Sequence, residues 1–136
     1  MDETSLTTGQ NRIRVAVVED NDDARELLSV FLSDSFDVVT YRNAEEALPR
    51  LIQQTAHVIL VDMRLPELDG IGLLELLRKA GVVAPMIMVT ANVFGNVEAK
   101  ALAAGFSAFV AKPILDMQAL VDQIHRLSRD FGSVVS

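Results

Sequence analysis

The chain contains no cysteine, and aromatic residues make up only 5% of its 136 residues. The absence of cysteine excludes a disulfide scaffold, a thiolate metal site and a cysteine nucleophile. Because half of the residues are hydrophobic while so few are aromatic, the core must be built from aliphatic side chains. The length is that of one domain, which can fold without covalent cross-links.

The chain also lacks long apolar runs and an excess of basic residues. No segment approaches the roughly 18 apolar residues that span a bilayer, and residues 1–12 show no signal-peptide pattern. We therefore expect a cytoplasmic protein without membrane insertion. Nineteen acidic residues against twelve Lys and Arg give a net charge of −7, which argues against direct nucleic-acid binding. Net charge alone does not show whether the acidic residues are gathered in one place.

From residue 13 onward, short apolar runs alternate with segments of helical period. The runs cover residues 13–18, 37–41, 57–61, 85–90 and 107–111. The segments between and after them carry apolar residues at i, i+3, i+4 and i+7. This alternation predicts an α/β protein with a doubly wound, flavodoxin-like (βα)5 fold, whose parallel five-stranded sheet has the order 2-1-3-4-5.

The same pattern divides the chain into three parts. Residues 1–12 are polar and are predicted to form a flexible tail. The domain covers residues 13–131, and residues 132–136 are predicted to be a short C-terminal tail. Within the domain, Pro49 falls inside the second helical segment, where it predicts a kink or a late helix start.

Four residues stand where helix N-caps are needed, and two glycines stand where helices should end. The expected N-caps are Asn21, Asn43, Asp69 and Asn96. Gly81 and Gly105 occupy the expected C-terminal positions.

Polar residues with complementary chemistry follow the predicted strands. Glu19 and Asp20 come after the first strand, Asp62 after the third, Thr90 ends the fourth, and Lys112 follows the fifth. In a doubly wound sheet, ligands bind beyond the carboxyl ends of the strands, where the strand order reverses. The three carboxylates should therefore share one pocket, where they could either share protons or hold a hard divalent cation. Oxygen-only ligands favour Mg²⁺.

The remaining two residues favour phosphoryl chemistry in this pocket. Thr90 offers a hydroxyl and Lys112 an ammonium group. A carboxylate, a metal, a hydroxyl and an ammonium group together suit transfer of a phosphoryl group to the carboxylate. The acceptor would be Asp62, which would form an aspartyl phosphate.

Four motifs together resemble the receiver domain of two-component response regulators. They are VVEDN at residues 17–21, LVDMRLPELDG at 60–70, MIMVTAN at 86–92 and AKPI at 111–114. The resemblance covers residues 13–131 and suggests a single-domain receiver. It implies a phosphorylation-dependent signalling switch rather than a conventional enzyme, with Mg²⁺ (or Mn²⁺) as cofactor. The implied phosphodonor is a histidine kinase or a histidine phosphotransfer domain.

The resemblance assigns the acidic residues to phosphoryl acceptance and metal binding. Asp62 matches the phosphoacceptor, and Asp20 matches a direct metal ligand. Glu19 stands where Asp is commoner and would reach the metal through water. The backbone carbonyl of Arg64 matches the third protein ligand.

The resemblance also assigns a switch. Thr90 matches the hydroxyl that turns toward the phosphoryl group, and Lys112 matches the lysine that pairs with it. Phe109 occupies the switch-aromatic position, without the hydroxyl of the commoner Tyr. Arg64 and Asn92 match positions that tune dephosphorylation. The bond between Lys112 and Pro113 resembles one that is cis in the family.

The switch implies partners. Phosphorylation would alter the face formed by the fourth helix, the fifth strand and the fifth helix, which would bind a downstream protein. The sequence leaves open whether the protein forms a homodimer.

Two alternatives remain at this point. A haloacid-dehalogenase-like phosphatase would use Asp20 as nucleophile, since Asp20-Asn21-Asp22 fits a D-x-D pattern, but it would leave Asp62 unexplained. A flavodoxin-like protein that binds FMN would need a Ser-, Thr- and Gly-rich phosphate loop after the first strand. The acidic residues found there repel phosphate unless a cation intervenes.

Overall fold

The computed structural model describes the backbone of residues 12–135 and the side chains of residues 12–130. Five parallel strands form one sheet in the order β2-β1-β3-β4-β5, as predicted. The strands are β1 (Arg14–Val18), β2 (Asp37–Tyr41), β3 (Val58–Val61), β4 (Met86–Thr90) and β5 (Ala108–Ala111). Residues 1–11 of the tail predicted for residues 1–12 lie outside the described residues.

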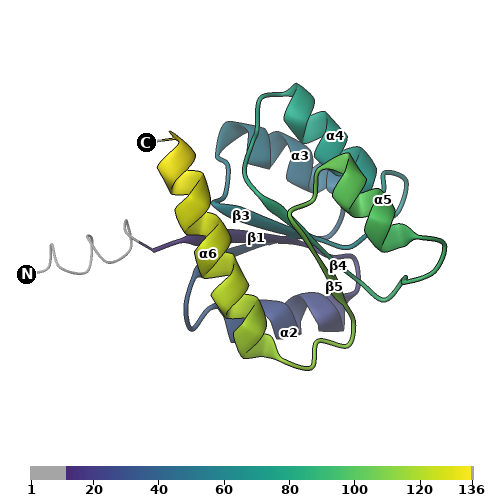
Figure 1. The fold of residues 1–136 in the computed structure, drawn as a ribbon, viewed down its shortest axis with the longest axis horizontal. Helices are drawn as coiled ribbons and strands as arrows, with labels where there is room; N and C mark the ends of the chain where they lie inside the picture. The colour runs from purple at the N-terminus through teal and green to yellow at the C-terminus, as the bar shows by residue number, and fades with distance from the viewer. Residues whose placement is uncertain (1–11, 136) are drawn as a thin grey trace, which may run out of the picture.

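Helices cover both faces of this sheet (Figure 1). The helices are α2 (Asp22–Leu32), α3 (Ala44–Gln53), α4 (Gly70–Lys79), α5 (Val97–Ala104) and α6 (Met117–Val135). Helices α2 and α6 pack on one face, and α3, α4 and α5 pack on the other. Strands β1, β3 and β4 are buried on both faces, which explains their nearly continuous apolar sequences.

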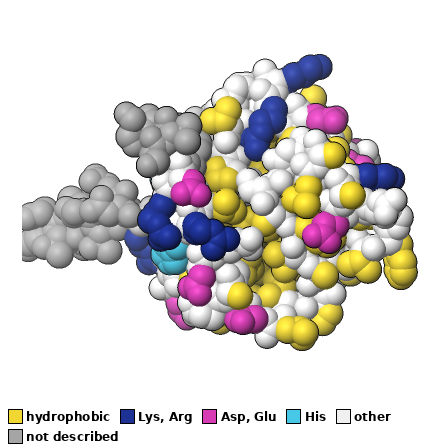
Figure 2. All heavy atoms as spheres, in the orientation of Figure 1, with side chains coloured by type: hydrophobic (Ala, Val, Ile, Leu, Met, Phe, Trp, Pro, Cys, Tyr) yellow, Lys and Arg dark blue, Asp and Glu magenta, His cyan; other side chains and the backbone are white. Residues whose placement is uncertain are grey.

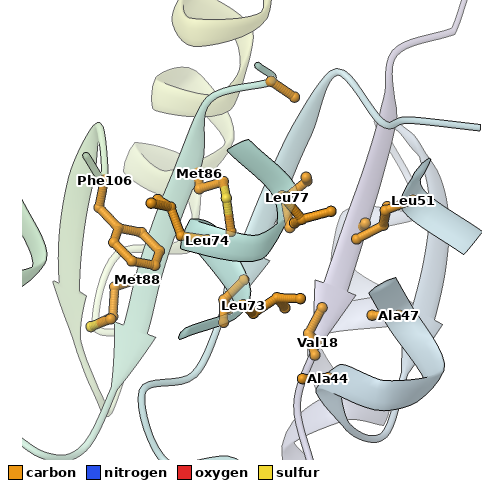
Figure 3. Close-up of a cluster of buried hydrophobic side chains, with 14 of the residues drawn as sticks. Val18, Ala44, Ala47, Leu51, Leu73, Leu74, Leu77, Met86, Met88 and Phe106 are labelled. Atoms are coloured by element: carbon orange, nitrogen blue, oxygen red, sulfur yellow. The ribbon is translucent and has the colours of Figure 1, made fainter. Parts of the chain in front are cut away.

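The core is aliphatic, as the composition predicts. Figure 3 shows the α3–α4 side, where Leu73, Leu74 and Leu77 of α4 lie between Met86 of β4 and Leu51 of α3. On this side the side chains from α3 include two alanines, which let the helix approach the sheet closely. A second cluster fills the space between the sheet and α2 and α6.

The four predicted N-cap residues lie directly before helices α2, α3, α4 and α5. Asn21, Asn43 and Asp69 each accept a hydrogen bond from the backbone N–H three residues later, at 2.8 Å. Asn96 precedes α5 but makes no such bond, because its backbone is left-handed with φ of 61°. Gly105, which ends α5, has φ of 124°, a conformation that favours glycine.

Three boundaries differ from the prediction. Helix α3 begins at Ala44 despite Pro49, so the expected late start is wrong. The Asn43 cap and the burial of Ala44, Ala47 and Leu51 stabilise the helix in spite of the hydrogen bond that proline removes.

At the C-terminus, α6 continues to Val135, so residues 132–135 are helical rather than a tail. Extending an existing helix is far easier than starting one, and Gly132 costs only about 1 kcal/mol. At the other end, Arg12 belongs to the folded domain rather than to the tail. Its guanidinium donates to the carbonyls of Ser33 and Phe36, at 2.9 and 2.8 Å, just beyond the end of α2.

The surface in Figure 2 carries acidic and basic side chains interspersed with apolar ones. On that face the Lys and Arg side chains lie among acidic ones. Within residues 12–135, none of the helices has the length and apolar character needed to cross a membrane.

Candidate functional site

The carboxyl ends of β1 and β3 place Glu19 and Asp62 side by side. Val18 pairs with Val61 in the parallel ladder, so the next residue of each strand is also adjacent. The ladders continue through both positions: Glu19 N–H donates to the Tyr41 carbonyl at 3.0 Å, and Asp62 N–H donates to the Val18 carbonyl at 3.1 Å. Both acidic residues are buried, with 2% and 7% of their surface exposed.

Lys112 bridges these two carboxylates from the end of β5. Its Nζ lies 2.6 Å from Glu19 Oε1 and 2.9 Å from Asp62 Oδ2. The other oxygen of each carboxylate accepts a backbone N–H: Glu19 Oε2 from Asn21 at 3.1 Å, and Asp62 Oδ1 from Arg64 at 2.9 Å. Every carboxylate oxygen of this buried pair therefore has a partner, as burial of charge requires.

Asp20 completes a group of three carboxylates. Glu19, Asp20 and Asp62 each offer one oxygen, and these oxygens lie within 4.8 Å of one another. Asp20 is exposed, so solvent reaches the group from its side. An all-oxygen set that is open to water fits Mg²⁺ or Mn²⁺, which keep several water ligands. The cluster would hold such an ion through Asp20 and Asp62.

All predicted site residues except Phe109 line one cavity of about 520 Å³. Arg64 lines it too, and the role of its backbone carbonyl as a metal ligand stays a prediction. Thr90 is buried at the cavity wall, where its Oγ1 accepts the Asn92 N–H at 3.1 Å. The Lys112 N–H donates to the Thr90 carbonyl at 3.0 Å, which extends the pairing of β4 and β5.

Phe109 of β5 does not line the cavity. It pairs with Met88 in the β4–β5 ladder and is partly buried against the core on the α3–α5 side. Thr90 follows Met88 by two residues and therefore faces the same side of the sheet. Phe109 and Thr90 therefore lie on the same face of neighbouring strands, two residues apart in register, while the movement of the aromatic side chain stays a prediction. The Lys112–Pro113 bond is cis, as the resemblance implied.

The electrostatics of the pair reflect burial. Burial raises the pKa of the Glu19 carboxyl above its ordinary 4.5, the Lys112 hydrogen bond opposes this rise, and the neighbouring Asp62 carboxylate adds to it. Burial disfavours the charged form of Lys112, yet the hydrogen bonds to Glu19 and Asp62 raise the pKa of its ammonium group overall. The lysine therefore stays charged at neutral pH.

We expect Glu19→Gln to stabilise the metal-free protein at neutral pH. Because the pKa of Glu19 is raised on folding, the folded chain holds this proton more tightly than the unfolded chain. The Glu19 contribution to the free energy of unfolding therefore falls as pH rises from 4.5 through the folded-state pKa. The stability advantage of the variant should be greatest at neutral pH and should shrink as the pH is lowered toward 4.5.

Urea unfolding in EDTA over a pH series measures this difference. Glu75→Gln, at an exposed position of α4, is the matched control and should show no such pH-dependent advantage. An advantage of Glu19→Gln that grows on acidification would contradict the prediction.

Sequence reasoning missed two residues of the site. Phe94 lines the cavity although it is 78% exposed. Arg25 of α2 donates from Nη1 to the backbone carbonyl of Glu19 at 2.9 Å. A basic residue one turn into the helix after an acidic loop was a usable signal for Arg25. The loop conformation that brings Phe94 to the cavity has no comparable signal.

Comparisons with known proteins identify the family of this chain. The family model of the response regulator receiver domain matches residues 15–125. An uncharacterized 14.6 kDa protein from the sodA1 3′ region of Leptolyngbya boryana is 34% identical over 114 residues, which cover 80% of this chain and 87% of that protein. The response regulator protein PilR of Pseudomonas aeruginosa is 32% identical over 105 residues, covering 76% of this chain but 24% of PilR.

Solved structures give the same result. The receiver domain of Francisella response regulator 1452 is 26% identical with a TM-score of 0.78, over 87% of this chain and 98% of that one. The receiver domain of the sensor histidine kinase PA1611 from Pseudomonas aeruginosa was solved with a magnesium ion coordinated in its active-site cleft. It is 27% identical with a TM-score of 0.77, over 86% of this chain and 98% of that one. The chain belongs to the response regulator receiver domain family.

Proposed function

We propose that this receiver domain takes a phosphoryl group onto Asp62 from a phosphohistidine of a histidine kinase or a histidine phosphotransfer domain. The observation that carries the proposal is the setting of Asp62. Its carboxylate is buried at the end of β3 and forms an ion pair with Lys112. It lines a cavity that Glu19 and Asp20 also line. This arrangement supports a nucleophile that is held in place and surrounded by charge-stabilising groups.

Each residue of the site would have its own role in phosphoryl transfer. A carboxylate oxygen of Asp62 attacks phosphorus, the phosphorus–nitrogen bond breaks, and the imidazole leaves with the electron pair. The ammonium group of Lys112, now bonded to Asp62 Oδ2, can pair with a phosphoryl oxygen. The hydroxyl of Thr90 can donate to another. A divalent cation held by Asp20 and Asp62 would neutralise charge on the phosphoryl oxygens during transfer.

A protein donor is supported by an apolar cleft next to the acidic cavity. The cleft measures about 400 Å³ and shares Ala24, Ala91 and Lys112 with the cavity. Leu27 forms part of its wall and is 64% exposed. Apolar side chains beside the phosphoacceptor would allow a donor protein to bury hydrophobic surface while it brings its histidine to Asp62.

The output would lie on the face formed by α5, β5 and α6, which corresponds to the predicted partner face. Phe109 belongs to this face through β5. We propose that movement of Thr90 and Phe109 after phosphorylation changes this face for a downstream protein. The cytoplasmic location and the homodimer stay predictions.

The two alternatives explain the site less well. A phosphatase with Asp20 as nucleophile leaves unexplained why Lys112 bonds to Asp62 rather than to Asp20. An FMN phosphate would face three carboxylates in the cavity, which repel it.

Phosphorylation of the purified protein tests the proposal. With a phosphodonor and Mg²⁺, intact mass should increase by one phosphoryl group, and Asp62→Asn should abolish the increase. Asp116→Asn, at an exposed position where asparagine can also cap α6, should leave it unchanged. Equal labelling of Asp62→Asn would contradict the proposal. Steady phosphoester turnover that is lost in Asp20→Asn but kept in Asp62→Asn would favour the phosphatase.

A further inference from the structure

Arg25 contacts the acidic loop that follows β1. Its side chain is 17% exposed, and its guanidinium reaches back from α2 to the end of the strand. Nη1 donates to the backbone carbonyl of Glu19 at 2.9 Å, and Nη2 lies 2.6 Å from Asp22 Oδ1. The side chain therefore joins the last residue of the strand ladder to the first residue of the helix.

The Glu19 carbonyl belongs to the same planar peptide group as the N–H of Asp20. The N–H and the carboxylate of Glu19 are held by other partners, but Arg25 is the donor to its carbonyl. Within the described residues, no hydrogen bond holds the Asp20 carboxylate itself, although it is one of the three oxygen donors of the cluster. The restraint that the structure shows on Asp20 therefore acts on its backbone, through the peptide group that Arg25 holds.

We propose that Arg25 is a positioning residue for the divalent cation. It fixes the peptide between Glu19 and Asp20 so that the Asp20 carboxylate stays directed toward the other two. The inference rests on the proposed function, because it takes the carboxylate cluster to be the metal site. Partners that orient metal ligands change metal affinity by roughly 10- to 100-fold when removed.

The direction in which cation affinity changes when Arg25 is replaced distinguishes positioning from simple electrostatics. Arg25 carries a positive charge close to the site, so its removal would tighten cation binding if charge alone mattered. Loss of positioning weakens cation binding instead. A lysine at this position keeps the charge, but it lacks the planar fork that serves the carbonyl and Asp22 together.

Calorimetric titration of the full chain with Mg²⁺ and with Mn²⁺ tests the inference. Arg25→Met keeps an apolar stem and removes the donors, and we expect its dissociation constant to rise about 10-fold. Asp22→Asn removes the ion pair with Arg25 but leaves the hydrogen bond from Arg25 to the Glu19 carbonyl. The affinity of this variant for the cation should therefore match that of the unchanged chain. Arg25→Lys should fall between Arg25→Met and the unchanged chain.

Affinity in Arg25→Met equal to or tighter than in the unchanged chain would overturn the inference. So would an equal loss in Asp22→Asn, because the ion pair rather than the carbonyl bond would then matter. If Arg25→Met does not fold by circular dichroism, Arg25→Lys decides, and unaltered affinity there overturns the proposal. Failure of the proposed function gives a different result. The unchanged chain would then bind no cation, or Asp20→Asn would bind the cation as tightly as the unchanged chain does.

Discussion

Replacing Lys112 with methionine should lower the free energy of unfolding of the metal-free protein by about 3 kcal/mol. The ammonium group lies within 2.9 Å of both Glu19 and Asp62, and its removal leaves two buried carboxylates without a cation. Their remaining backbone donors, at Asn21 and Arg64, satisfy hydrogen bonds but do not neutralise charge. Repulsion between the carboxylates then adds to the cost of keeping each of them out of water.

Divalent cations provide a second readout of this variant. Millimolar Mg²⁺ should restore part of the lost stability, because a bound cation would neutralise the same carboxylates. Urea unfolding in EDTA and in Mg²⁺ measures both effects. Lys100→Met, at an exposed position of α5, is the matched control and should change stability by no more than about 0.5 kcal/mol. A Lys112→Met variant as stable in EDTA as this control would contradict the inference that Lys112 stabilises the two buried carboxylates.

Replacing Gly70 with alanine should destabilise the fold by about 2 kcal/mol and slow phosphorylation of Asp62. A Cβ at this position would lie 2.7 Å from the backbone carbonyl oxygen of Asp62 and 3.2 Å from the Cα of Met63. Both are backbone atoms of the segment that carries Asp62, the proposed phosphoacceptor, so either α4 or that segment must shift. The Gly70 N–H also donates to the Met63 carbonyl at 3.1 Å, which ties the helix start to the same loop.

Gly72→Ala is the matched control, because it lies two residues further along α4. Its added Cβ would meet Leu68 Cδ1 at 2.6 Å, but that atom is the end of a flexible side chain that can turn away. Alanine also favours the helix by about 1 kcal/mol over glycine, so the net change should be small. Thermal unfolding and the rate of mass increase with a phosphodonor measure both variants. Equal behaviour of Gly70→Ala and Gly72→Ala would show that close backbone packing at Gly70 does not matter.

Local sequence signals predicted the elements that depend on neighbouring residues. Asn21, Asn43 and Asp69 begin helices because a side-chain acceptor satisfies an N–H three residues away, which is a local event. Apolar runs buried on both faces predicted the parallel strands and hence their order. Where local signals competed with packing, packing decided. Pro49 lies inside α3 because the apolar face of that helix is buried against the sheet.

The residues that would meet could also be predicted without the structure, because the carboxyl ends of parallel strands share one edge of the sheet. Glu19, Asp62 and Lys112 accordingly line one pocket, although the lysine lies 93 residues from the glutamate. The pairing of individual atoms became visible in the folded chain, where Lys112 bridges both carboxylates and Arg25 donates to the carbonyl of Glu19. Residue order determines which strand ends are adjacent, whereas side-chain pairing depends on rotamers, register and loop shape, which long-range packing selects.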